Sequence, residues 1–190
     1  MPRLPEMYSP PVASIGHVAV GIAAARATRP VGSILVRAVA LSAFSLLPDV
    51  DVVGFAAGVP YGAPWGHRGA THSLAMAVFV GMLCGVAVRV GARGPDVSRC
   101  AWSAAAVVAL VVASHGLLDA MTDGGRGVAL LWPFTAHRYF LPWRPIPVAP
   151  IGIAFFSVQG MRVAAVELLE FAPFLLYGLW PRRPAPRRST

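Results

Sequence analysis

The chain contains no lysine and only eight acidic residues, so arginine alone supplies its positive charge. Charged residues make up 13% of its 190 residues, against roughly 25% in an average soluble protein. Hydrophobic residues make up 56%, and the mean hydropathy is +0.64. This balance excludes an ordinary soluble domain and predicts a polytopic membrane protein.

Cysteine is scarcer than acid, with two residues in the chain. Cys84 lies inside one apolar stretch and Cys100 lies near the start of another, and the two form no CxxC pair. This spacing argues against both a disulfide framework and a thiolate zinc site. The first residues, MPRLPEMYSPPVAS, contain no apolar run of the kind that a cleavable signal peptide needs. We therefore expect the membrane segments themselves to direct insertion.

The net charge of +8 raises the alternative of nucleic-acid binding. The arginines, however, flank apolar segments, whereas a nucleic-acid interface has them along one face with aromatic residues between them. Flanking arginine is typical of membrane topology. We expect no nucleic-acid partner.

Apolar stretches separated by proline, glycine and arginine predict an all-α fold, a membrane helical bundle of about four to six helices. Pro30 and Pro48 end the first two stretches, which are short for a bilayer that takes about 20 residues to cross. The third and fourth are long enough to cross, and the last is one long or two short helices broken near Gly160 and Pro173. The expected helices cover residues 14–28, 31–47, 71–90, 101–121 and 151–180.

We expect these helices to form one membrane-embedded domain over residues 14–180. An N-terminal arm over residues 1–13 precedes it. A basic, proline-rich tail over residues 181–190 follows, and its composition is typical of disorder.

The loop WGHRGATHS, residues 65–73, leads directly into the third expected helix. Thr71 is the expected cap of that helix, which would place His72 in its first turn. Arg68 is suited to a bidentate grip on a phosphate or a carboxylate, and the alternative is an ion pair with Asp49 or Asp51.

His115 and Asp119 lie four residues apart on the fourth expected helix. Residues at this spacing share one face, so the two side chains are placed to hold one metal ion or two neighbouring ones. The alternative is a pair that only stabilises the helix. Ionisable groups are costly in an apolar segment, which favours the functional interpretation.

Asp49 and Asp51 follow Pro48, and alternate residues of an extended segment point the same way. Two neighbouring carboxylates can bind a cation, whereas the alternative for each is to cap a turn. His17, in the first turn of the first expected helix, is a weak signal by itself. His137 has no partner at a suitable spacing and is interpreted as a membrane-interface residue.

Taken together, these clusters gather four of the five histidines and four of the eight acids at one expected membrane face. Nitrogen and carboxylate ligands without thiolate favour zinc, with manganese or iron as alternatives. The opposite face collects most of the arginines, which makes it cytoplasmic by the positive-inside rule. The site would then face outward and the tail would be cytoplasmic.

Five short motifs, in this order, resemble a known family. They are GHVAVG, LLPDVD, HRGATHS, SHGLLDAMTDGG and LLWPF, and the resemblance covers roughly residues 14–150. The pattern resembles the membrane-bound metal-dependent hydrolases of the YdjM type, an inner-membrane, LexA-regulated family. That family is similar in turn to zinc-dependent phospholipase C and the single-strand-specific zinc nucleases, which are all-helical.

The resemblance implies hydrolysis of a phosphoester by a metal-activated water, at one or two zinc ions. A membrane lipid or another small phosphoester would be the substrate. Arg68 would stabilise developing charge, and Asp51 or His67 would be the general base or would orient a ligand. The two rival functions are a metal-stapled membrane protein without turnover and a small transporter of metal ions or solutes. The implied metal ligands are His17, Asp49, His72, His115 and Asp119.

Overall fold

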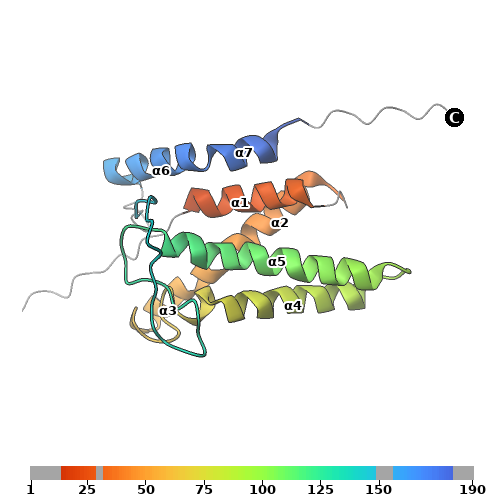
Figure 1. Cartoon of the computed structure of the whole chain (residues 1–190), viewed down its shortest axis with the longest axis horizontal. Coiled ribbons are helices and arrows are strands. Elements are labelled where there is room, and N and C mark those ends of the chain that lie inside the picture. The colour runs from red at the N-terminus through yellow and green to blue at the C-terminus, as the bar shows by residue number, and fades with distance from the viewer. Residues whose placement is uncertain (1–13, 29–31, 149–155, 182–190) are drawn as a thin grey trace, which may run out of the picture.

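The computed structural model describes residues 14–28, 32–148 and 156–181 (Figure 1). In these ranges the fold is all-α, as predicted, and extended pairing is confined to two isolated bridges. The expected N-terminal arm, and the expected tail beyond residue 181, lie outside the described residues. The helices are α1 (Ser14–Ala27), α2 (Ile34–Leu46), η1 (Leu47–Val52), α3 (Val53–Ala56), η2 (Ala70–His72), α4 (Leu74–Gly91), α5 (Val97–Ala120), α6 (Val158–Glu170) and α7 (Ala172–Leu179).

Helices α4 and α5 form an antiparallel hairpin that runs the length of the bundle (Figure 1). Helix α1 packs against α2, α5 and α7. The turn between α4 and α5 lies at one end of the bundle, and α3 and the long loops gather at the other end (Figure 1). The residues singled out in the sequence lie at the end with the loops.

Small residues allow α4 and α5 to pack closely. A Cβ at Gly81 would lie 2.4 Å from the carbonyl oxygen of Ala105, and a Cβ at Gly85 would lie 2.9 Å from the Cβ of Ala105. Glycine and alanine are the residues through which helices approach each other inside membranes. The hairpin is therefore held by backbone proximity as well as by apolar side chains.

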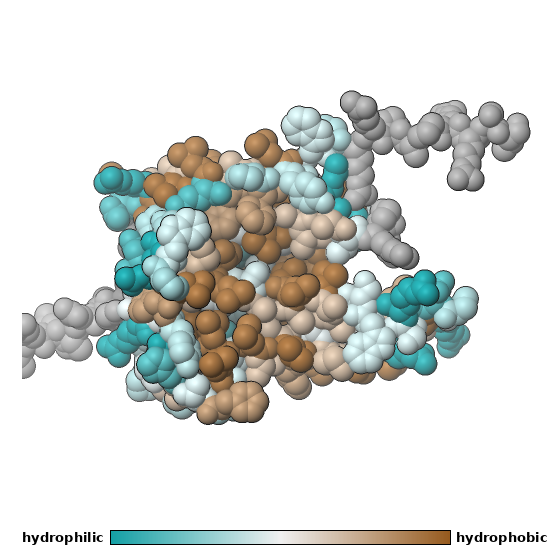
Figure 2. All heavy atoms as spheres, in the orientation of Figure 1, coloured by the Kyte–Doolittle hydropathy of each residue, from teal (hydrophilic) through white to brown (hydrophobic). Residues whose placement is uncertain are grey.

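Three helical segments are long and apolar enough to cross a membrane: Ile34–Ala56, Leu74–Gly91 and Val97–Ala120. The first joins α2, η1 and α3 into 23 residues, which corrects the expectation that this region is short for a bilayer. Figure 2 shows apolar surface across the middle of the molecule and polar surface towards both ends. This distribution is that of a membrane-embedded bundle.

Two element boundaries differ from the sequence-based expectation. Ser73 caps α4, because its hydroxyl accepts a hydrogen bond from the Met76 amide at 3.1 Å, whereas Thr71 was the expected cap. Helix α5 begins at Val97, four residues before the expected start at residue 101.

Asp49 and Asp51 lie in the 3₁₀ helix η1 and not in the expected extended segment. Pro48 stands in the first turn of η1, where its missing amide hydrogen costs no intrahelical bond. The last apolar stretch is two helices, which meet at Phe171, and Pro173 occupies the first turn of α7.

Candidate metal centre

Four donor side chains converge where η1, η2 and the end of α5 meet. Each offers one ligand atom, and the four atoms all lie within 4.8 Å of one another. His115 and Asp119 share one face of α5, as their spacing predicted. The four residues are Asp49, His72, His115 and Asp119.

The spacing of these atoms suits one metal ion. The Nε2 atom of His72 lies 3.4 Å from Oδ1 of Asp49 and 3.3 Å from Oδ2 of Asp119. The Nε2 atom of His115 lies 3.3 Å and 3.7 Å from the same two oxygens. The two Nε2 atoms are 3.0 Å apart. Ligands of a tetrahedral zinc with bonds of about 2.0–2.1 Å are ~3.4 Å from each other, so the donors need little movement to bind.

The Nδ1 atoms of His72 and His115, which face away from the other donors, determine how the two rings are oriented. Nδ1 of His115 lies 2.7 Å from the carbonyl oxygen of Ser45, which can only accept, so Nδ1 carries the hydrogen. Nδ1 of His72 lies 3.0 Å from the Thr71 hydroxyl, which itself donates to Asp51, and 3.2 Å from Oδ2 of Asp51, so it is held in the same way. Both Nε2 atoms therefore face two carboxylates, and a positive charge between them, a proton or a metal ion, stabilises the group.

The electrostatics of His72 agree with this geometry. Burial lowers the pKa of His72, but the surrounding carboxylates of Asp119, Asp49 and Asp51 outweigh burial and raise it well above its usual value. The same field that holds a proton on His72 attracts a divalent cation. Two nitrogen and two carboxylate donors fit zinc or a similar metal.

Asp51 connects the centre to the neighbouring loop. Its Oδ1 lies 2.7 Å from Nδ1 of His67, and its Oδ2 accepts a hydrogen bond from the Thr71 hydroxyl at 2.6 Å. Asp51, His67 and His72 form a second group whose ligand atoms lie within 4.8 Å of one another. Asp51 thus contacts the outer nitrogens of two imidazoles, which is the geometry of a residue that orients a ligand.

Arg68 is fully buried and has a positive φ of 60°, which is uncommon for a residue other than glycine. Its Nε lies 3.1 Å from Oδ2 of Asp119, and its Nη2 donates to Oδ1 at 3.3 Å. Its Nη1 donates to the Thr122 hydroxyl and to the carbonyl oxygen of Gly124. The ion pair is therefore with Asp119, and not with Asp49 or Asp51 as considered from the sequence.

His17 is fully buried beside the four donors. Its ring stacks on His115 with centroids 3.8 Å apart, and its Nε2 lies 3.7 Å from Oδ1 of Asp119. Among the described residues, neither nitrogen of His17 has a hydrogen-bond partner. The structure thus places His17 next to the centre, adjacent to the four-donor group.

Glu167, on α6, is a buried residue to which the sequence assigned no role. Its Oε2 accepts a hydrogen bond from the Ile15 amide at 3.0 Å, in the first turn of the helix that carries His17. Burial raises the pKa of Glu167 to about 7. The sequence did contain a signal for Glu167, because it is an acid among apolar residues near the middle of an expected helix.

Arg138 is the second residue without an assigned role, and it ties the loops of the centre together. Its guanidinium donates to the carbonyl oxygens of His67 and Tyr61, each at 2.9 Å. Nothing in its sequence context distinguishes it from other loop arginines.

Comparison with known proteins gives a family match and a relative. The family model described as YdjM inner membrane protein matches residues 12–183. The inner membrane protein YbcI of Escherichia coli (strain K12) is 43% identical over an alignment of 145 residues, which covers 73% of this chain and 80% of the relative. No solved structure matches.

Proposed function

The chain belongs to the YdjM inner membrane protein family, and from that premise we propose that it is a membrane-embedded, metal-dependent hydrolase of phosphoesters. The observation that carries the proposal is the convergence of two imidazole nitrogens and two carboxylates, within 4.8 Å, at the end of a membrane bundle. Folding stability does not require such a group, because burying two neighbouring carboxylates costs free energy unless positive charge compensates them.

Asp49, His72, His115 and Asp119 would hold the metal, with His17 as a neighbouring ligand for a second ion. Zinc is the first expectation, with manganese or iron as alternatives. A divalent metal in such a site supplies Lewis-acid activation of a water and of a phosphoryl oxygen.

The remaining side chains would act around the metal. Asp51 fixes the ring of His72 through Nδ1, and Arg68 fixes the carboxylate of Asp119 while adding positive charge beside it. His67 has a buried Nε2 without a hydrogen-bond partner among the described residues, which makes it the group available to exchange a proton.

Asp49 marks the open edge of the centre. Its side chain is 15% exposed, whereas those of His72, His115 and Asp119 are at most 3% exposed. A substrate would therefore approach past Asp49. The neighbouring residues Val50, in η1, and Val53, at the start of α3, are exposed and apolar, which suits a lipid phosphoester that arrives from the bilayer.

One observation supports the alternative of a structural metal site without turnover: His72, His115 and Asp119 are almost completely buried. A structural site is closed, whereas a catalytic site keeps an open position for substrate. A transporter is disfavoured, because its ligands are expected near the bilayer midplane, whereas His72 precedes α4 and Asp119 stands at the end of α5.

The test measures turnover on metal-loaded protein in detergent. Release of water-soluble phosphoesters from phosphatidylethanolamine and phosphatidylglycerol, together with hydrolysis of bis(p-nitrophenyl) phosphate, would be followed for wild type, Asp49→Asn and the exposed control His137→Ala. We expect turnover in wild type and the control, and at least a hundredfold loss in Asp49→Asn. Bound metal without turnover on any of these substrates would assign the centre a structural role.

A further inference from the structure

An open groove lies between α4 and α5, towards the end of the hairpin that is distant from the metal centre. It encloses about 180 Å³. Both helices are candidate membrane spans, so the groove lies on a surface that meets lipid. Its principal lining residues are Met82, Gly85, Arg89, Ser98, Ala101 and Trp102.

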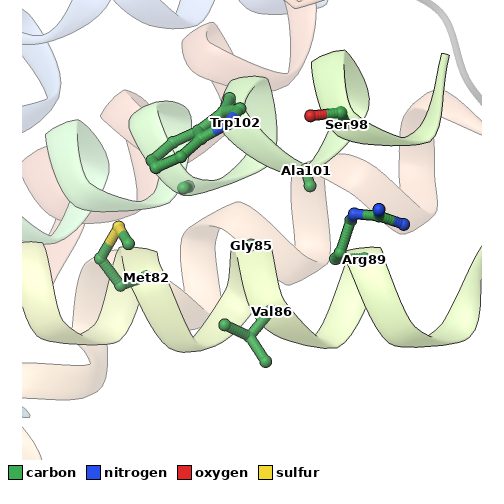
Figure 3. A pocket seen from close by; sticks show the side chains of 8 residues that line it. Met82, Gly85, Val86, Arg89, Ser98, Ala101 and Trp102 are labelled. Atoms are coloured by element: carbon green, nitrogen blue, oxygen red, sulfur yellow. The ribbon is translucent and has the colours of Figure 1, made fainter.

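The groove has a polar end and an apolar end. Figure 3 shows the side chains of Arg89 and Ser98 together at the end nearer the α4–α5 turn, and those of Met82 and Trp102 at the other end. Met82 and Trp102 are 43% and 64% exposed, although both are large and apolar. The groove is thus amphipathic along its length.

Close helix packing forms the floor of the groove. A Cβ at Gly85 would lie 3.0 Å from the carbonyl oxygen of Ala101. The small side chains that allow this approach leave a depression, which the larger residues Met82 and Trp102 border. The shape therefore follows from the packing of the hairpin.

Charge at the polar end is positive. Arg89 is exposed and forms no ion pair within the described part of the chain. Arg93 and Arg99 are also exposed and follow Arg89 by four and ten residues, and Asp96 is the one acid in this stretch. Basic pockets between membrane helices attract anionic lipid headgroups.

We propose that this groove is a binding site for an anionic phospholipid. The lipid phosphate contacts the guanidinium of Arg89 and the hydroxyl of Ser98. One acyl chain follows the floor over Gly85 and Ala101 towards Trp102. The site does not depend on the metal centre or on any hydrolase activity.

Native mass spectrometry of the full chain in detergent tests the proposal, with phosphatidylglycerol and phosphatidylcholine as probes. We expect preferential retention of phosphatidylglycerol by wild type. Arg89→Gln should weaken that binding about five-fold, the effect expected for one arginine near a membrane surface. Arg93→Gln is the matched control outside the groove and should have less effect, whereas Trp102→Ala should weaken binding of both lipids.

Three results would overturn the proposal. Equal retention of the two lipids would remove the headgroup site. Equal effects of Arg89→Gln and Arg93→Gln would reduce the preference to general surface charge. A dimer that retains no lipid and dissociates in Trp102→Ala would assign the groove to a second copy of the chain.

Discussion

At the scale of single residues, hydrogen placement determines what the centre can bind. His115 is fixed by the carbonyl oxygen of Ser45, and His72 is fixed by the Thr71 hydroxyl and the carboxylate of Asp51. These groups accept the hydrogen of Nδ1 and leave Nε2 directed at the other donors. The metal-binding form of both rings is therefore preset by groups that do not themselves belong to the four-donor set.

Asp51→Asn tests this arrangement without removing any of the four donors. The neutral amide loses the charge that holds the His72 ring, and loss of such a supporting residue typically weakens metal affinity by about 10–100-fold. A competition titration of zinc against a chelator measures the change. An unchanged affinity would show that Asp51 does not orient His72.

At the scale of helices, the α4–α5 hairpin places His72 and Asp119 together. Helix α4 starts at Leu74, just after His72, and α5 ends at Ala120, just after Asp119. Both residues therefore lie at the same end of the antiparallel hairpin. The hairpin fixes their separation only if its two helices keep their close contact along Gly81 and Gly85.

Gly81→Ala should disturb this contact, because the added methyl would meet the Ala105 carbonyl oxygen and the Cβ of Ala109 at 2.4 and 2.7 Å. Overpacking of this kind costs about 1–3 kcal/mol. Gly91→Ala is the matched control, since a Cβ there meets nothing within 4 Å. Thermal unfolding in detergent should show a lower midpoint for Gly81→Ala alone, and equal midpoints would contradict the packing argument.

The contact between α6 and α1 should depend on pH. Helix α6 lies outside the three candidate spans, and burial raises the pKa of Glu167 from 4.5 to about 7, with Glu170 and Asp119 adding to the rise. A carboxyl group with a raised pKa binds its proton more tightly in the folded state. Its contribution to stability is therefore complete below about pH 4.5 and is lost as the pH rises through about 7.

Glu167→Gln removes that titration and keeps an oxygen that can accept from the Ile15 amide. The unfolding midpoint of the variant should rise relative to wild type between pH 5 and pH 8. The comparison of the two proteins at each pH cancels the histidines that titrate in both. A difference that is constant across this range would show that Glu167 does not change its protonation on folding.

At the scale of the whole molecule, the two polar ends carry different chemistry. The end with the loops holds the donor set, and the end with the α4–α5 turn holds Arg89 in α4, Arg93 in the turn and Arg99 in α5. Apolar surface separates the two ends (Figure 2). By the positive-inside rule, the turn is expected on the cytoplasmic side and the metal centre on the opposite side.

Cysteine labelling on intact cells tests this orientation. The exposed Cys100 lies near the turn, and Ala136→Cys in a Cys100→Ala background places a thiol on the exposed loop at the other end. A membrane-impermeant maleimide should label the introduced cysteine in intact cells and Cys100 only after permeabilisation. The reverse pattern would place the metal centre in the cytoplasm.

Much of this architecture follows from the sequence, because helix spacing and proline positions are local signals. Asp49, His72, His115 and Asp119 form one group. The spacing of His115 and Asp119 on a helix predicted that pair, and the resemblance to a known family implied the other two as ligands. The all-α fold and two of the three candidate spans, Leu74–Gly91 and Val97–Ala120, followed from the length of apolar stretches, whereas the span Ile34–Ala56 did not.

The remaining features depend on contacts between residues distant in sequence. Asp119 as the partner of Arg68, and the Ile15 amide as the partner of Glu167, follow from how α1, α5 and α6 pack. Thr71 was expected to cap α4, but its hydroxyl is bonded to Asp51, twenty residues earlier. Ser73, two residues on, caps the helix instead, because propensity alone does not distinguish adjacent capping residues.

The most direct test of the central claim is the metal content of detergent-purified protein, measured by elemental mass spectrometry. Wild type, His72→Ala and Asp119→Ala would be compared, with His137→Ala as the control outside the centre. We predict stoichiometric zinc or manganese in wild type and the control, and its loss in both centre variants. Wild type without bound metal after reconstitution with divalent ions would contradict the account and leave the four side chains as a buried polar network.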